Sequence, residues 1–181
     1  MGWPQSARIE PICTQSATRR IMSFRPSGSI PEMLLLERAV PADIDSIHHL
    51  LAEQFDEHDI DTSTKVLRHA IAAVLQNEAL GLFVVARDGG EIVGLAALSF
   101  AWTLEHGGKS AWLDELYVVP ERRGRGIGRA LLVRVIDEAR ALGCKAIDLE
   151  VEEAHHRAER LYEREGFHPL ARTRWVKSVT E

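Results

Sequence analysis

Residues 112–142 read WLDELYVVPERRGRGIGRALLVRVIDEARAL, and this stretch decides the fold. An alternating apolar run ends at Pro120, and a loop of arginines and glycines follows it. Directly behind the loop, apolar residues recur at helical spacing. They are Ile127, Leu131, Val135, Ala139 and Leu142. The pattern predicts a strand, a glycine-rich loop and a helix in immediate succession.

The loop has the composition of an anion-binding site. Gly124, Gly126 and Gly128 lack Cβ atoms where the helix begins, so backbone N–H groups are free to point outward at the positive end of the helix dipole. Glu121 is the only nearby acid in the sequence, whereas four arginines surround the glycines. These are Arg122, Arg123, Arg125 and Arg129. The excess of positive charge predicts a ligand with several phosphate charges, such as a pyrophosphate-bearing cofactor.

Other interpretations of this loop compete with an anion site. A dinucleotide-binding loop needs G-x-G-x-x-G, but the third position counted from Gly124 is Arg129. The Gly-Lys-Ser/Thr ending of a Walker loop is missing from the sequence as well. A glycine-rich turn with solvated arginines is the plain alternative, and the crowding of four arginines favours the anion site over it.

Two segments resemble motifs of the GNAT superfamily of acetyl-CoA-dependent N-acetyltransferases. Arg123-x-x-Gly126-x-Gly128, which follows LYVVP at residues 116–120, resembles the family's coenzyme A signature. Downstream, AERLYEREGF at residues 158–167 resembles its A-x-x-LY-x-x-x-GF segment. The order of the two motifs makes the resemblance specific, and it extends more weakly over residues 33–177.

The resemblance implies an α/β (α+β) fold with a central mixed, mostly antiparallel twisted sheet. About six to seven strands and about four helices are expected, in a single N-acetyltransferase domain over residues 33–181. The chain has 181 residues with 45% hydrophobic content, which suffices for one buried core. Residues 1–32 are rich in serine, threonine and proline, and we expect them to form a flexible extension.

Charge and hydropathy limit the partners and the location of the protein. The net charge of -5 argues against general nucleic-acid binding, because the relevant basic residues are concentrated in one loop. No apolar run approaches the roughly 20 residues of a membrane helix, and residues 1–32 lack the apolar core of a secretory signal. We therefore expect a cytoplasmic protein that binds neither nucleic acid nor membranes, and a homodimer is compatible with the sequence.

The cysteines and histidines predict no metal site. Cys13 and Cys144 lie far apart and form neither a disulfide framework nor a CxxC pattern. The 8 histidines include the pairs His48-His49 and His155-His156, without the helical i, i+4 spacing or the cysteine partners of a zinc site.

The remaining pattern predicts the other elements in chain order. Ser63 is the expected N-cap of the second helix, and Asp-Gly-Gly-Glu at residues 88–91 is a hairpin signal. The stripes of the first two helices are Ile44, Ile47, Leu51 and Phe55, then Val66, Leu67, Ala70, Ile71 and Val74. Strands are expected at residues 33–39, 82–87, 92–101, 110–119, 145–151 and 167–177. Residues 102–109 are predicted to be a loop, and the last helix should end at Gly166.

Two acids on the strand before the loop are candidates for a general base. An alkylammonium group with a pKa near 10.4 must lose a proton before its nitrogen can attack, and a carboxylate can take that proton. Neighbours in a regular strand face opposite sides, so only one of Asp114 and Glu115 can face the amine. Asp114 is favoured, because similar small-amine acetyltransferases carry an acid at its position, and Glu115 is the alternative.

The resemblance implies further roles. Tyr162 would protonate the leaving thiolate, and a packing aromatic is its structural alternative. The backbone N–H groups of Leu116, Tyr117 and Val118 would polarise the acetyl carbonyl and pair with the pantetheine arm. His155 stands where many relatives have an asparagine that binds the cofactor. The loop residues expected to bind acetyl-CoA are Arg123, Gly124, Arg125, Gly126, Ile127, Gly128 and Arg129.

Acids after the first helix bear on the acceptor, because the family's acceptor site commonly borders this region. They are Glu53, Asp56, Glu57, Asp59 and Asp61. A solvated loop is their plain interpretation, whereas acids that line a pocket would favour a cationic amine. The sequence predicts acetyl transfer from acetyl-CoA to a small primary amine. The alternatives are a protein N-terminal or lysine acetyltransferase and a non-catalytic acetyl-CoA-binding sensor.

Overall fold

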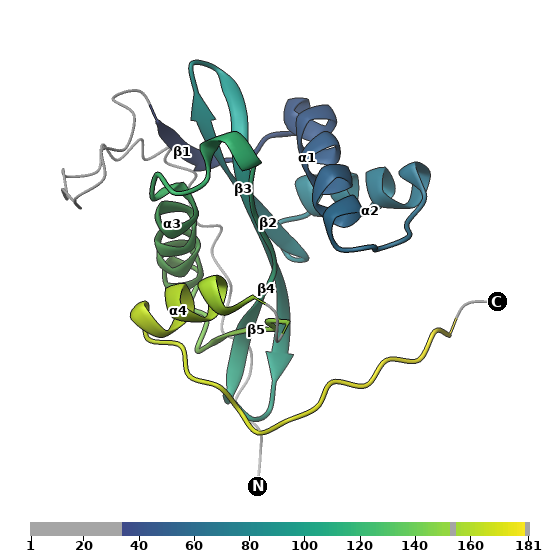
Figure 1. The fold of residues 1–181 in the computed structure, drawn as a ribbon. Coiled ribbons are helices and arrows are strands. Elements are labelled where there is room, and N and C mark those ends of the chain that lie inside the picture. Colours follow the sequence, from purple (N-terminus) through teal and green to yellow (C-terminus); the bar gives the residue numbers. More distant parts are fainter. Residues whose placement is uncertain (1–33, 153–154, 180–181) are drawn as a thin grey trace, which may run out of the picture.

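The computed structural model describes residues 34–152 and 155–179, which form one five-stranded sheet with helices on both faces (Figure 1). In chain order, the elements are β1 (Leu35–Arg38), η1 (Pro41–Asp43), α1 (Ile44–Glu57), α2 (Thr64–Gln76), β2 (Gly81–Asp88), β3 (Glu91–Thr103), β4 (Gly108–Val118), η2 (Pro120–Arg122), α3 (Ile127–Ala141), β5 (Ile147–Leu149) and α4 (His156–Arg164). The extension expected at residues 1–32 lies outside the described residues.

The sheet has the order β1-β2-β3-β4-β5. The first four strands pair antiparallel in sequence, and β5 pairs parallel with β4 after the crossover through α3. The expected mixed, mostly antiparallel sheet and four α-helices are therefore confirmed. The described strands number five, fewer than the six to seven expected.

The strand predicted at residues 167–177 is not formed. These residues follow α4 as an extended tail that leaves the sheet (Figure 1). Ion pairs of 2.7 Å from Arg172 to Glu105 and 2.5 Å from Arg174 to Glu150 hold the tail at its side chains. Periodicity identifies a segment that favours extended backbone, but a strand also needs an edge to pair with, and β5 has only 3 residues.

Two hydrophobic clusters, one on each face of the sheet, hold the elements in place. Ile127, Leu131 and Val135 of α3 belong to the cluster on one face, whereas Ile47 of α1 and Ile71 of α2 belong to the other (Figure 1). Because helices cover both faces, consecutive residues of β2 are buried. This double burial explains the continuous apolar run of β2 in the sequence.

Local predictions differ in outcome. Ser63 caps α2 as expected, because its Oγ accepts a hydrogen bond of 3.3 Å from the Val66 N–H. The placement of Val66 on the apolar stripe is wrong, since this residue is 60% exposed. The loop predicted at residues 102–109 is shorter than expected, because β3 runs to Thr103 and β4 begins at Gly108. Residues 104–107 form the turn between them, in which Gly107 adopts a φ of 67°. None of the helices in the described ranges combines the length and apolar composition that crossing a membrane requires.

Candidate active site

A β-bulge in β4 carries the two acids that the sequence singles out. Glu115 lies opposite Ala97 of β3 and Leu113 lies opposite Leu98, so Asp114 is an extra residue in the ladder. The premise that these two acids must face opposite sides therefore fails, because a bulge interrupts the alternation of a strand. The two carboxylates are close enough for the charge of Asp114 to act on Glu115.

β4 and β5 separate beside this bulge. Their parallel pairing joins residues 111–113 of β4 to Ile147–Leu149. Beyond Leu113, no strand among the described residues covers this edge of β4, so its backbone groups are available to a ligand. A ligand bound along this edge would pass Glu115 on its way to the loop at the end of β4.

The pairing of β4 with β3 determines which backbone N–H groups of β4 point toward its uncovered edge. The Val119 N–H donates to the Val93 carbonyl at 3.0 Å, beyond the end of the β3–β4 ladder. Because hydrogen bonds alternate along an antiparallel strand, the Tyr117 N–H points toward β3. The N–H groups of Leu116 and Val118 point toward the open edge. Two of the three expected backbone donors thus lie where a ligand can reach them.

Glu115 has the environment of a general base. Its Oε2 accepts a hydrogen bond of 2.6 Å from Nε2 of Gln54 on α1. Burial, together with the neighbouring charge of Asp114, raises the pKa of the Glu115 carboxyl to about 7, against the lowering effect of the Gln54 hydrogen bond. A carboxyl group with this pKa is partly ionised at neutral pH and can take up or release a proton there.

Asp114 has a more open position. Its side chain is exposed, yet the protein atoms around it partly desolvate the carboxylate and raise its pKa. Hydrogen bonds from Ser99 and the positive charge of Arg174 act in the opposite direction. Ser99 belongs to β3, so these bonds hold the Asp114 carboxylate against the neighbouring strand.

Tyr162 of α4 approaches Glu115. Its half-buried ring packs against the cluster beneath α3 and meets the ring of Phe167 edge-on, with 5.8 Å between centroids. Burial, with the charge of Glu115 as a second cause, raises the pKa of the Tyr162 hydroxyl to about 12. The fold therefore brings Tyr162 and Glu115 together from distant parts of the chain.

The glycine loop, residues 119–126, has a backbone suited to anion binding. Gly124 and Gly126 both adopt a φ of 81°, a conformation that favours glycine, and Gly126 is the N-cap of α3. Gly128 lies in the first turn of α3, without a positive φ. The Ile127 side chain is buried in the core, which leaves its backbone N–H as the group available to a ligand.

Three of the four arginines around the glycine loop are neutralised by acids from other elements. The pairs are Arg122 with Asp88 at 2.9 Å, Arg123 with Glu57 at 2.7 Å and Arg129 with Glu165 at 2.6 Å. Glu121 is therefore not the only acid near the loop, because the fold adds three that the local sequence does not contain. Arg125 is exposed and forms no ion pair with any described residue.

Two residues of the site lie outside the motifs and were not predicted. Arg157, in the first turn of α4, lies beside the glycine loop: its Nη2 is 3.7 Å from the place that a Cβ on Gly124 would occupy. Gln54 of α1 holds Glu115. No local pattern marks either residue, because each reaches the site from a separate element.

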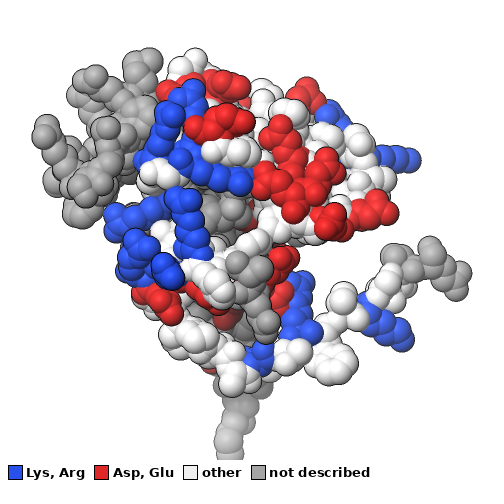
Figure 2. Space-filling model, viewed as in Figure 1, with Lys and Arg blue, Asp and Glu red and all other residues white. Residues whose placement is uncertain are grey.

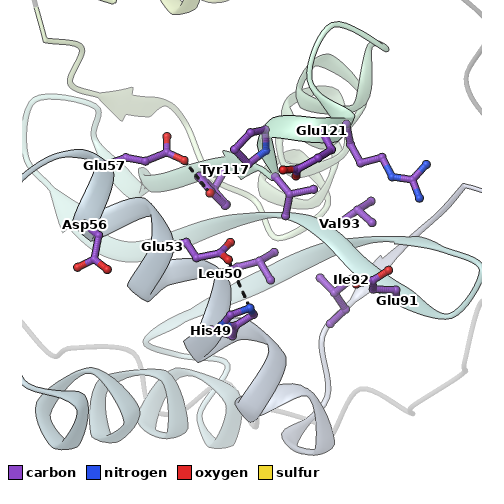
Figure 3. A pocket seen from close by; sticks show the side chains of 13 residues that line it. His49, Leu50, Glu53, Asp56, Glu57, Glu91, Ile92, Val93, Tyr117 and Glu121 are labelled. Atoms are coloured by element: carbon purple, nitrogen blue, oxygen red, sulfur yellow. Dashed lines mark hydrogen bonds and ion pairs between the residues drawn. The ribbon is translucent and has the colours of Figure 1, made fainter.

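An acidic pocket of about 750 Å³ opens between α1 and the glycine loop (Figure 3). Five carboxylates line this acidic pocket, from Glu53, Asp56, Glu57, Glu91 and Glu121. The Tyr117 hydroxyl donates to Glu57 at 2.9 Å, and hydrogen bonds from Arg123 and Tyr117 outweigh desolvation and lower the pKa of Glu57. Asp59 and Asp61, the other acids that the sequence suggests, are exposed and are not part of the lining.

His155, the expected cofactor contact, is the N-cap of α4 and lies against the end of α1. Its ring meets that of His58 edge-on at 5.0 Å between centroids. Its Nδ1 lies 4.0 Å from Oε2 of Glu152. The contact of His155 with a cofactor stays a prediction.

Comparison with protein families and with curated proteins identifies similar chains. The model of a family described as the acetyltransferase (GNAT) family matches residues 44–167. The aminoalkylphosphonate N-acetyltransferase of Salmonella typhimurium is 31% identical over 132 residues, which cover 73% of this chain and 83% of that protein. The mycothiol acetyltransferase of Propionibacterium freudenreichii is 33% identical over 143 residues, which cover 76% of this chain but only 44% of that protein.

Solved structures share the fold. An integron cassette protein from the mobile metagenome of Cole Harbour Salt Marsh has a TM-score of 0.72 and 25% sequence identity, over 81% of this chain and 91% of that one. An aminoglycoside N-acetyltransferase solved in complex with coenzyme A has a TM-score of 0.70 over 84% of this chain and 100% of that one. Its 15% identity supports the likeness of fold alone.

Proposed function

The chain belongs to the GNAT family of acetyltransferases, and from that premise we propose that it transfers the acetyl group of acetyl-CoA to the primary amine of a small molecule in the cytoplasm. One observation carries the proposal. Glu115, whose pKa is raised to about 7, lies at the open edge of β4 beside Tyr162, on the line that leads to the glycine loop. The proposed base and the anion site thus follow one another along β4, and α4 brings the proposed acid beside the base.

The glycine loop is suited to the pyrophosphate of the cofactor. The N-terminus of α3 offers backbone N–H groups at the positive end of its dipole, and Gly124 and Gly126 leave space around them. Arg125 and Arg157 supply the positive charge, because the other arginines of the loop are engaged with acids. Along the open edge of β4, Leu116 and Val118 offer N–H donors to the pantetheine arm and the acetyl carbonyl.

Glu115 is the base that we favour, with Asp114 as the alternative. Moving a proton from an ammonium group of pKa about 10.4 to a carboxylate of pKa 4.5 is uphill by roughly 8 kcal/mol. Transfer to a carboxylate of pKa about 7 is uphill by only roughly 5 kcal/mol. The raised pKa of Glu115 therefore suits it to take the proton as the amine nitrogen attacks, directly or through a water molecule.

Tyr162 completes the proton balance. The amine nitrogen forms a bond to the acetyl carbon, the carbon–sulfur bond breaks, and the thiolate takes the proton of the tyrosine hydroxyl. The second proton that the nitrogen loses restores the tyrosine hydroxyl, and Glu115 releases the first proton to water. A hydroxyl with a pKa of about 12 is a weak acid toward a thiolate of pKa about 8.5. Protonation of Glu115 removes the negative charge that helps to raise the pKa of Tyr162, so uptake of the amine proton makes the hydroxyl a stronger acid.

The acidic pocket supports a cationic acceptor. Glu57 pairs with Arg123, and the other four carboxylates of the pocket attract an ammonium-bearing molecule and repel acidic ones. Helix α1 joins the pocket to the proposed base, because it carries both Glu57 and Gln54. The names of the relatives point to small molecules, an aminoalkylphosphonate and mycothiol, and not to proteins. A small polyamine or aminosugar combines these properties.

The test is a panel of amines with acetyl-CoA, scored by release of the coenzyme A thiol. We expect turnover with small cationic amines and weaker turnover with acidic ones. Activity on peptides alone would replace this proposal with a protein acetyltransferase. Calorimetric binding of acetyl-CoA without turnover on any amine or peptide would indicate a sensor.

Tyr162→Phe should lower kcat with little change in acetyl-CoA affinity, because the hydroxyl acts when the thiolate leaves.

A further inference from the structure

Two histidines and one glutamate converge where α1 ends and α4 begins. His58 is the C-cap of α1, Glu152 follows β5, and His155 is the N-cap of α4. The Nδ1 of His58 lies 3.8 Å from Oε1 of Glu152, and the Nδ1 of His155 lies 4.0 Å from Oε2. One ligand atom from each of the three residues lies within 4.8 Å of the others. The three side chains thus converge on one point from the end of α1, the segment after β5 and the start of α4.

The side chains of these three residues are of the types that bind metal ions. Two imidazole nitrogens and one carboxylate oxygen form a ligand set that Zn²⁺ accepts, with bonds of about 2.0 to 2.2 Å. Tetrahedral bonds of that length place ligand atoms roughly 3.3 Å apart, so a movement of up to about 0.9 Å per side chain closes the set. The side chains can make that movement, because 23% of His58, 43% of His155 and 65% of Glu152 are exposed.

The sequence hides this cluster. Zinc sites are usually recognised from ligands at short, regular spacing, whereas His58 and the pair Glu152 and His155 come from opposite halves of the chain. Only the packing of the end of α1 against the start of α4 brings them together. The expectation of no metal site rests on the spacing of the histidines and on their lack of cysteine partners, and neither criterion takes account of contacts between distant segments.

We propose that His58, Glu152 and His155 bind a divalent transition-metal ion of the Zn²⁺ class. Three protein ligands leave a fourth tetrahedral position open to water or to a small ligand. The bound ion would tie the end of α1 to the start of α4. These two helices also carry Gln54 and Tyr162, which contact or face the proposed base. The ion would therefore fix the position of α1 relative to α4 on the two sides of Glu115. This structural role goes beyond the proposed acetyl transfer.

The experiment is calorimetric titration of the full chain, without an affinity tag, with ZnCl₂ alone. We expect one ion per chain, and a higher unfolding temperature in the presence of Zn²⁺. His58→Gln and His155→Gln should each weaken binding by more than about tenfold and abolish the thermal shift. His156→Gln is the matched control, because His156 neighbours the cluster in sequence but contacts Glu159 at 3.1 Å.

Wild-type protein that binds no Zn²⁺, or ligand variants that bind it as tightly as the wild type and His156→Gln, would overturn the proposal. Circular dichroism of each variant establishes that it is folded, and Glu152→Gln supplies a third independent ligand variant. The titration contains neither acetyl-CoA nor an amine. Its outcome is therefore independent of the proposed acetyltransferase activity, which the amine panel tests separately.

Discussion

The glycine loop and the acidic pocket lie side by side, carry opposite charges and are built in different ways (Figure 2). Lys and Arg side chains gather over the loop and the start of α3, and Asp and Glu side chains gather over α1. The glycine loop is one continuous segment, whereas the pocket combines residues of α1, β3 and β4 with the first residues of that loop, 119–122. An anion site can be encoded locally, while a site for a cationic partner here depends on the fold.

The two regions are also linked. Arg123 of the glycine loop pairs with Glu57 of the acidic pocket at 2.7 Å, and its guanidinium lies 5.2 Å from the centroid of the Tyr117 ring. Its Nε also donates to the Val118 carbonyl at 2.8 Å. Arg123 therefore joins the end of β4 to α1, and this arginine of the family signature has a structural role beside any contact with the cofactor.

Among the substitutions that test this comparison, replacing the proposed base should produce the largest change in kcat/KM. Glu115→Gln should lower kcat/KM at pH 7 by about 100- to 10,000-fold, because the ammonium proton loses its acceptor. The loss should shrink as pH rises toward the pKa of the amine, where free amine forms without help. pH–rate profiles measure both effects.

Asp114→Asn is the matched comparison for Glu115→Gln. Removing the Asp114 charge removes one cause of the raised pKa of Glu115, so the acid limb of the profile should move to lower pH while turnover persists. If instead Asp114→Asn shows the large loss at neutral pH and Glu115→Gln does not, Asp114 is the base and the order of the two acids is reversed.

The same contrast explains what the sequence could predict. Strand, loop and helix between residues 112 and 142 follow from local periodicity and glycine placement, and the structure has them there. The bulge at Asp114 does not follow, because pairing with β3 creates it. The partners of the arginines, the approach of Arg157 and the hydrogen bond from Gln54 are likewise long-range contacts without a local signal.

The second prediction concerns stability, because a buried base should be costly to the fold. Glu115 has a folded pKa of about 7 and an unfolded pKa near 4.5, so its contribution to stability is lost as pH rises through this range. Glu115→Gln should therefore be more stable than the wild type at pH 8.5, by at most about 3 kcal/mol, and show no such gain at pH 4.

Urea unfolding at both pH values measures this difference. Glu163→Gln is the control, because Glu163 is an exposed acid of α4, and its stability difference from the wild type should stay small at both pH values. A Glu115→Gln variant that is equally destabilised at pH 4 and pH 8.5 would indicate that the Gln54 hydrogen bond, and not the buried charge, dominates at this position.

The third prediction concerns Arg125 and Arg157, the two arginines beside the glycine loop that form no ion pair with any described residue. Arg125→Ala and Arg157→Ala should each weaken acetyl-CoA binding by about 10-fold, because each removes a charged donor to phosphate. Both losses should diminish at high salt. Arg140→Ala is the control, since Arg140 lies at the far end of α3 and pairs with Asp137 at 2.6 Å. Calorimetry that finds all three variants equal to the wild type would remove these arginines from the cofactor site.

The smallest expected effect lies within the glycine loop itself. Gly126 has a φ of 81°, and an L-residue in that conformation is strained by roughly 1 to 2 kcal/mol, so Gly126→Ala should lower the free energy of unfolding by about 1 kcal/mol. Gly128 has no positive φ, and a Cβ there would lie 3.8 Å from Cγ2 of Val118, an ordinary contact. Gly128→Ala should therefore raise the free energy of unfolding by up to about 1 kcal/mol, because alanine favours a helix. Chemical denaturation of both variants decides the matter: opposite signs mean that backbone conformation requires glycine at Gly126, whereas equal losses mean that both positions need space for another reason.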